Sequence, residues 1–70
     1  MEPVSPFARN LREARQRAGI LQERLAFTAQ LHRTEISLLE RGEREPRLST
    51  IVRLARGLDV SPASLLEGIE

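Results

Sequence analysis

The sequence predicts an all-α protein: one compact domain of five short helices over residues 1–70. Strand signals are almost absent, because the only aromatic residues are two phenylalanines and the β-branched residues are scattered. Apolar residues recur instead at the three- and four-residue spacing of helices. Serine–proline pairs and glycines stand where such helices would begin and end.

The first helix is predicted to begin at the pair Ser5–Pro6, because serine caps a helix and proline suits its first position. Gly19 follows the last apolar residue and can take the left-handed conformation that ends a helix. The apolar stripe between them consists of Phe7, Leu11, Ala14 and Ala18.

Four more helices follow from the same signals. Two are predicted over residues 22–29 and 33–40. The fourth is expected to use Ser49 as its cap and to end at Gly57. The fifth is expected from the pair Ser61–Pro62, which repeats the start signal of the first helix.

Composition excludes several classes of function. The chain has no cysteine and one histidine, His32, so we expect neither disulfides nor a metal site. The sequence has no glycine-rich phosphate loop and no nucleophile–base pair, so we expect no enzyme, cofactor or small-molecule ligand. No apolar run reaches the roughly 18 residues of a membrane span, and Met1 to Val4 begin no secretory signal. We therefore expect a cytoplasmic protein that does not bind membranes.

The type of basic residue in the chain is more informative than its net charge. The formal net charge is only +1, but all eleven basic residues are arginine. Arginine suits bidentate hydrogen bonding to phosphate and guanine. A general preference of the genome for arginine codons would give the same composition.

Residues 22–41 carry the pattern that bears on function, since two short helices are separated by about three residues. The apolar residues between the two helices are Leu25, Ala29, Leu31, Ile36 and Leu39. This is the spacing of a helix-turn-helix. In that motif the second helix enters the DNA major groove, and its N-terminal residues contact base edges.

An ordered set of residues carries a resemblance to a known family. The set is Leu11, Arg12, Arg15, Gly19, Gln22, Glu23, Leu25, Ala26, Ile36, Ser37, Leu39, Glu40, Arg41, Gly42, Pro46, Leu54, Ala55, Leu58, Val60, Ser61, Leu65 and Leu66. In these residues the chain resembles the phage-repressor-like (Cro-like, xenobiotic-response-element type) helix-turn-helix family. The resemblance implies a five-helix lambda-repressor-like DNA-binding domain. The shorter stretch 31–37 is similar to controller proteins of restriction–modification systems.

The chain departs from the family pattern in the turn and at the helix starts. Gln30 stands where the family commonly has glycine, which costs about 1 kcal/mol if the backbone has positive φ. Leu21 and His32 precede the two motif helices where serine or threonine is usual. We therefore expect both helices to begin without their best caps.

Base reading is expected from the start and the outer face of the second motif helix. Arg33 can donate two hydrogen bonds to guanine, and Thr34 can contact a thymine methyl group. Ser37 and Leu38 lie one turn later on the same face. Alternatively Arg33 contacts a phosphate or an acidic neighbour, and Leu38 is an ordinary surface leucine. Glu35 either accepts from cytosine or, as we expect, turns away to pair with an arginine.

Phosphate contacts are expected from Gln22, His32, Arg41 and Arg44. The resemblance implies this role for Gln22 at the start of the first motif helix and for the two arginines beside the following loop. Alternatively, His32 acts only as a helix cap, Gln22 is an exposed polar residue near a helix start, and Arg41 and Arg44 are solvated loop residues. The family pattern also implies a structural ion pair between Arg15 and Glu40.

A homodimer is expected, because a domain of this size has a small core and regulators of this type bind two half-sites. Its predicted interface consists of Val60, Leu65, Leu66 and Ile69. Alternatively, most of this apolar stripe belongs to the core of the domain. Two functional hypotheses follow. In the first, the chain is a dimeric transcriptional regulator that binds double-stranded DNA at a palindromic operator, and the family resemblance implies that it is a repressor. In the second, it keeps the fold but binds protein, as an antitoxin or an adaptor.

Overall fold

The computed structural model describes residues 5–70, so the predictions concerning residues 1–4 lie outside it. The described chain folds into four α-helices and one 3₁₀ helix, with no strand between residues 5 and 70. The elements are α1 (Pro6–Ala18), α2 (Gln22–Ala29), α3 (Arg33–Glu40), α4 (Leu48–Leu58) and η1 (Pro62–Leu66). The all-α prediction is confirmed.

The start and end of α1 follow from local hydrogen bonding. The Ser5 hydroxyl accepts a hydrogen bond from the Ala8 amide at 3.1 Å, and Pro6 occupies the first helical position. Gly19 ends the helix at φ 72°, a conformation that glycine takes without steric cost. The serine, proline and glycine that predicted this helix are therefore the residues at which it begins and ends.

The predicted fourth and fifth helices need correction. Helix α4 begins at Leu48 and has no side-chain cap, so Ser49 is not its cap. Gly57 lies inside the helix, and Asp59 takes the left-handed conformation at its end. The last element, over Pro62–Leu66, is a 3₁₀ helix rather than an α-helix, and it is capped by Ser61 as predicted.

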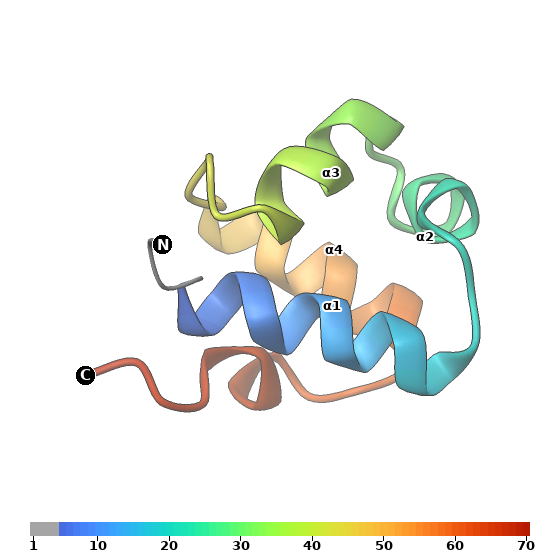
Figure 1. Cartoon of the computed structure of the whole chain (residues 1–70). Coiled ribbons are helices and arrows are strands. Elements are labelled where there is room, and N and C mark those ends of the chain that lie inside the picture. The colour runs from blue at the N-terminus through green and yellow to red at the C-terminus, as the bar shows by residue number, and fades with distance from the viewer. Residues whose placement is uncertain (1–4) are drawn as a thin grey trace.

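The helices surround one core (Figure 1). Helix α1 packs against α3 on one side and against η1 on the other, while α4 lies behind α1 and contacts both α2 and η1. The core side chains are Phe7, Leu11, Ala14, Leu25, Ala26, Ala29, Ile36, Leu39, Ile51, Leu54, Ala55, Leu58 and Leu65. Helix α3 therefore rests on α1 and α2, with its far side toward solvent.

No helix within residues 5–70 has the length and apolar character needed to cross a membrane.

Candidate nucleic-acid interface

The turn between α2 and α3 is held by the backbone. Gln30 ends α2 at φ 58°, so a non-glycine residue occupies the left-handed region here. The Leu31 amide then donates to the Ala26 carbonyl oxygen at 2.9 Å. The turn thus has the geometry that a glycine would favour, at a cost of about 1 kcal/mol for glutamine.

At the start of α3, His32 has the capping role that the sequence analysis gave as its alternative. His32 does supply a cap, because its Nδ1 accepts a hydrogen bond from the Thr34 amide at 3.0 Å. Of the two motif helices, only α2 lacks a side-chain cap, since Leu21 has no acceptor. An imidazole that accepts through Nδ1 carries its proton on Nε2, which remains as a donor.

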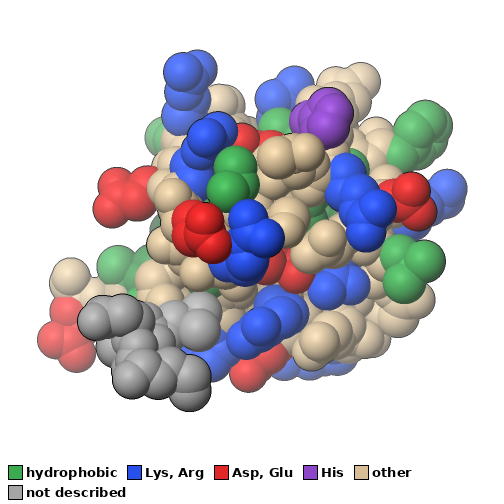
Figure 2. Space-filling view, turned by 45° about the horizontal axis from the view of Figure 1, so that its top comes forward, with side chains coloured by type: hydrophobic (Ala, Val, Ile, Leu, Met, Phe, Trp, Pro, Cys, Tyr) green, Lys and Arg blue, Asp and Glu red, His purple; other side chains and the backbone are tan. Residues whose placement is uncertain are grey.

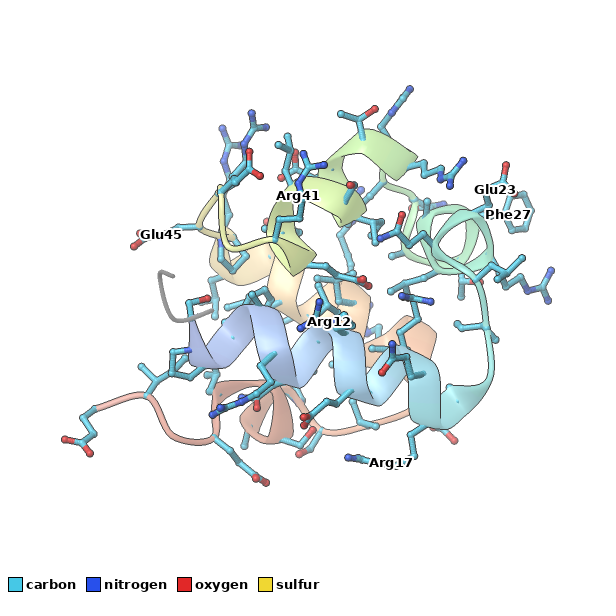
Figure 3. All side chains as sticks on the ribbon, in the orientation of Figure 1. Arg12, Arg17, Glu23, Phe27, Arg41 and Glu45 are labelled. Carbon is cyan, nitrogen blue, oxygen red and sulfur yellow. The ribbon has the colours of Figure 1, made fainter. Side chains whose placement is uncertain are left out.

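A shallow hollow opens where α2 and α3 begin. Its lining residues are Gln22, Arg33, Thr34, Ser37 and Arg41, and all five were predicted to contact DNA. They come from the start of α2, from α3 and from the residue that follows α3. Figure 3 shows Arg41 at the C-terminal end of α3 and Glu23 on the outer side of α2. The structure therefore gathers predicted base-reading and phosphate-contacting groups on one surface.

The predicted base-reading residues differ in their exposure. Thr34 is exposed, and the side chain of Arg33 is 62% exposed, with NH1 3.9 Å from the Glu23 carboxylate. Ser37 and Leu38 are half-buried. Leu38 is therefore less exposed than expected for an outer-face residue. The first turn of α3 is the part of this helix most accessible to a ligand.

Glu40 is a buried residue beneath this surface, and its carboxylate binds side chains from two other helices. Its carboxylate accepts from Arg15 Nε at 2.6 Å and from Arg15 NH2 at 3.1 Å, with side-chain exposures of 13% for Arg15 and 3% for Glu40. The expected ion pair is therefore present, and it is largely buried. The same carboxylate accepts from Gln22 Nε2 at 3.1 Å. Glu40 thus fixes the side chain predicted to contact a phosphate.

Two exposed ion pairs flank the C-terminal half of the motif. Arg41 Nε lies 2.8 Å from a Glu43 carboxylate oxygen. Arg44 NH1 donates to Glu35 Oε1 at 2.7 Å, so Glu35 does turn toward an arginine. Figure 2 shows acidic side chains interspersed among the arginines on this face.

Arg53 is a basic residue that the sequence analysis missed. It lines a second hollow together with Glu35, Arg44 and Arg47. Thr50 and Arg53 lie one turn apart on one side of α4, and Arg47 directly precedes the helix. This three-residue spacing was the available signal.

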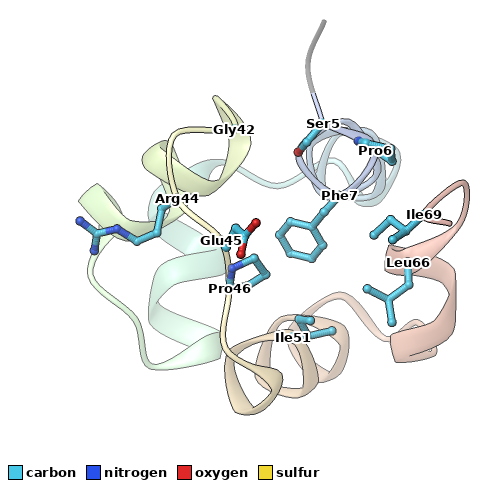
Figure 4. Close-up of a pocket in the computed structure, with 10 residues that line it drawn as sticks. All are labelled: Ser5, Pro6, Phe7, Gly42, Arg44, Glu45, Pro46, Ile51, Leu66 and Ile69. Carbon is cyan, nitrogen blue, oxygen red and sulfur yellow. The ribbon is translucent and has the colours of Figure 1, made fainter.

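The predicted dimer residues do not all remain available for a partner subunit. Leu65 is 1% exposed and belongs to the core, so its assignment to an interface is wrong. Val60 is partly buried and packs against the core. Leu66 and Ile69 remain 38% and 50% exposed. They line an apolar hollow together with Phe7, Ile51 and Pro46 (Figure 4).

Among residues 5–70, no cluster of His, Asp or Glu side chains could hold a metal ion.

Comparisons with known proteins agree with this geometry. A helix-turn-helix family model matches residues 11–65. Control protein C.BamHI of Bacillus amyloliquefaciens is 40% identical over 62 residues, which are 87% of this chain and 76% of that protein. These matches confirm the resemblance to a helix-turn-helix family that the sequence indicated.

Two solved structures have similar folds. The restriction-modification controller protein C.AhdI of Aeromonas hydrophila superposes with a TM-score of 0.84 at 42% identity, covering 86% of this chain and 91% of that one. The DNA-binding domain of the P22 c2 repressor gives a TM-score of 0.86 at 28% identity, covering 96% of this chain and 88% of that one. The similarity to restriction–modification controllers thus extends from the stretch 31–37 to most of the chain.

Proposed function

The chain belongs to the helix-turn-helix family, and we propose from this premise that it is a transcriptional regulator that binds double-stranded DNA at specific sequences. The hollow at the start of α3 carries the proposal, because amide, hydroxyl and guanidinium groups meet there on one exposed surface. These groups suit phosphate oxygens and base edges. The names of the relatives, control protein and repressor, support the same function.

Helix α3 is the element proposed to read bases. Arg33 and Thr34 begin it and are exposed, and the N-terminal residues of the second motif helix meet base edges in the major groove. Arg33 would donate to O6 and N7 of a guanine, and Thr34 would contact a thymine methyl group. The half-buried Ser37 and Leu38 would add a hydroxyl and an apolar contact one turn later.

Four side chains are proposed to contact phosphates: Gln22, His32, Arg41 and Arg44. The Gln22 amide is held by Glu40 and has a second N–H to donate outward. The His32 ring has its Nε2 proton free of the cap hydrogen bond. Arg41 and Arg44 carry charge and lie at the C-terminal end of the motif. Such contacts fix the position of the protein on the duplex and do not select its sequence.

The regulator is proposed to act as a homodimer on a palindromic operator. Two half-sites one helical turn apart, about 34 Å, require two reading helices. Leu66 and Ile69 are exposed apolar side chains beside an apolar hollow that lies between the C-terminal residues and the loop after α3. A two-fold contact there would bury them and would leave both α3 helices free.

The identity to control proteins narrows the proposal further. C.BamHI and C.AhdI are 40% and 42% identical to this chain, and the latter is a restriction-modification controller. We propose that the chain is likewise a cytoplasmic regulator of restriction–modification genes and that it acts as a repressor.

The test is fluorescence anisotropy of the wild type and of Arg33→Ala against duplexes enriched from a random pool, at about 50 and 200 mM salt. We expect palindromic sites that the wild type binds tightly and that Arg33→Ala no longer prefers over random duplex. Affinity should fall with salt at a log–log slope of about −0.9 for each phosphate neutralised. Weak binding without an enriched sequence, unchanged in Arg33→Ala, would instead favour a protein-interaction module.

A further inference from the structure

Each arginine around α3 that is proposed to contact DNA faces a carboxylate in the free protein. Arg41 pairs with Glu43 at 2.8 Å and Arg44 pairs with Glu35 at 2.7 Å. Arg33 lies 3.9 Å from Glu23, which is the loosest of the three contacts. The guanidinium groups needed for phosphate are therefore already engaged by internal anions.

We propose that Glu43 and Glu35 are internal competitors of DNA phosphate, which occupy Arg41 and Arg44 in the free protein and so lower its affinity for any duplex. The inference rests on the proposed function. A carboxylate presents two acceptor oxygens to a guanidinium group much as a phosphate does, so the two anions compete for the same donors. When DNA binds, a phosphate then replaces the carboxylate at each arginine, so the number of ion pairs does not increase.

The exposure of these pairs makes the exchange feasible. The side chains of Arg41, Glu43 and Arg44 are 54–56% exposed. Exposed pairs are weak, so a phosphate can displace the carboxylate. The displaced carboxylate nevertheless stays within about 10 Å of the phosphates, where salt at 0.1 M screens its repulsion only in part. The carboxylate therefore disfavours the bound state twice, by competition and by repulsion.

Glu43 offers the cleaner test, because its side chain has no other described hydrogen bond and does not contribute to the core. Glu35 is less exposed, at 23%, and stands in the first turn of α3, where a negative charge also favours the helix. Glu40 is different from both, since it is buried and structural.

The experiment measures binding of a random-sequence duplex by fluorescence anisotropy from about 50 to 200 mM salt. The proteins are the wild type, Glu43→Gln, Glu35→Gln and Glu13→Gln. The control Glu13→Gln makes the same charge change on α1, on the side that faces Ser61 and Leu65 rather than α3. Thermal unfolding of each variant establishes that the fold is retained.

We expect Glu43→Gln and Glu35→Gln to bind the duplex about two- to tenfold more tightly at low salt, and Glu13→Gln to change binding much less. The log–log salt slope of the two interface variants should be steeper by up to about one. Equal affinities for Glu43→Gln, Glu13→Gln and wild type, with the wild type binding DNA, would overturn this inference alone. Failure of every protein to bind any duplex would overturn the proposed function together with it.

Discussion

Among single residues, Glu40 connects the stability of the domain to its surface. Its carboxylate joins Arg15 on α1 and Gln22 on α2 while standing at the end of α3 itself. A buried charge that loses its partner is costly, because neither water nor a counter-ion replaces the lost contacts. The pair is therefore more important for this fold than an exposed ion pair would be.

Replacing Glu40 by alanine should destabilise the protein by about 3–5 kcal/mol, since Arg15 would be left without its buried partner. A domain of this size has a total stability of about the same magnitude, so Glu40→Ala should be largely unfolded at 25 °C. The matched change Glu43→Ala removes an exposed carboxylate and should cost less than about 1 kcal/mol. Urea unfolding followed by circular dichroism measures both, and equal stabilities would contradict this account of Glu40.

Arg41 should behave as a phosphate contact and Arg33 as a base contact. Arg41→Ala should weaken binding to the operator and to random duplex by the same factor, because phosphates carry no sequence information. Its log–log salt slope should be less steep by about 0.9. Anisotropy titrations on both duplexes provide the comparison. A loss confined to the operator would make Arg41 a base-reading residue instead.

Among elements, the turn between α2 and α3 contains the clearest local conflict. Gln30 holds φ 58°, where a side chain costs about 1–2 kcal/mol and glycine has no such cost. Gln30→Gly should therefore stabilise the protein by up to about 1 kcal/mol after the greater chain entropy of glycine is counted. Chemical denaturation measures the change. Gln30→Ala serves as the control and should give no gain, and a less stable Gln30→Gly would refute this reading of the turn.

Helix α1 was predictable from the chemical signals at its two ends, and α2 and α3 were predictable from the spacing of their apolar residues. Ser5 and Pro6 start α1, Gly19 ends it, and α2 and α3 have the predicted bounds. The resemblance to a known family then supplied the proposed contact residues, which the fold brings to one surface. Local signals sufficed where a helix end depends on its own residues.

Elsewhere the signals were ambiguous. A glycine that ends a helix and a glycine that permits close packing look the same in a sequence. A Cβ atom on Gly57 would lie 3.3 Å from Leu25 Cδ1, so its lack of a side chain lets α4 approach α2. Leu65 and Leu66 are adjacent, and only the docking of η1 buries the first and exposes the second. Tertiary contacts decide such positions.

The cap formed by His32 is not one that helix-capping preferences favour. Histidine is not among the preferred capping residues, yet its Nδ1 caps α3.

For the whole molecule, α3 and η1 lie on opposite sides of α1, and the apolar hollow lies between the loop after α3 and the C-terminal residues. Helix α3 packs on one side, and η1 with the C-terminal residues packs on the other (Figure 1). The Asn10 amide ties this second side to α1, donating to the carbonyl oxygens of Leu65 at 3.0 Å and Glu67 at 2.8 Å. The exposed Leu66 lies between these two anchor points.

Asn10→Ala should therefore weaken a dimer that uses Leu66 and Ile69. The two lost hydrogen bonds hold η1 and Glu67 against α1 within one subunit and contribute about 1 kcal/mol each. Their loss should raise the dissociation constant of the dimer by up to about tenfold, because Leu66 would no longer be held in place for the contact. Sedimentation equilibrium measures the dimer, with Leu66→Ser as a variant that changes the contact directly. A dimer that Leu66→Ser weakens but Asn10→Ala leaves unchanged would show that the tether has no role in assembly.

The central claim is that the first turn of α3 reads bases. A double-mutant cycle that combines Arg33→Ala with the change of one guanine in the operator tests it most directly. Wild type and Arg33→Ala are titrated against the selected operator and against operators changed at single guanines. For the wild type, one guanine change should cost about 1–3 kcal/mol. For Arg33→Ala, that same change should cost almost nothing, because the side chain that reads it is gone. If every base change costs both proteins the same, Arg33 does not read the sequence and this account of the interface is contradicted.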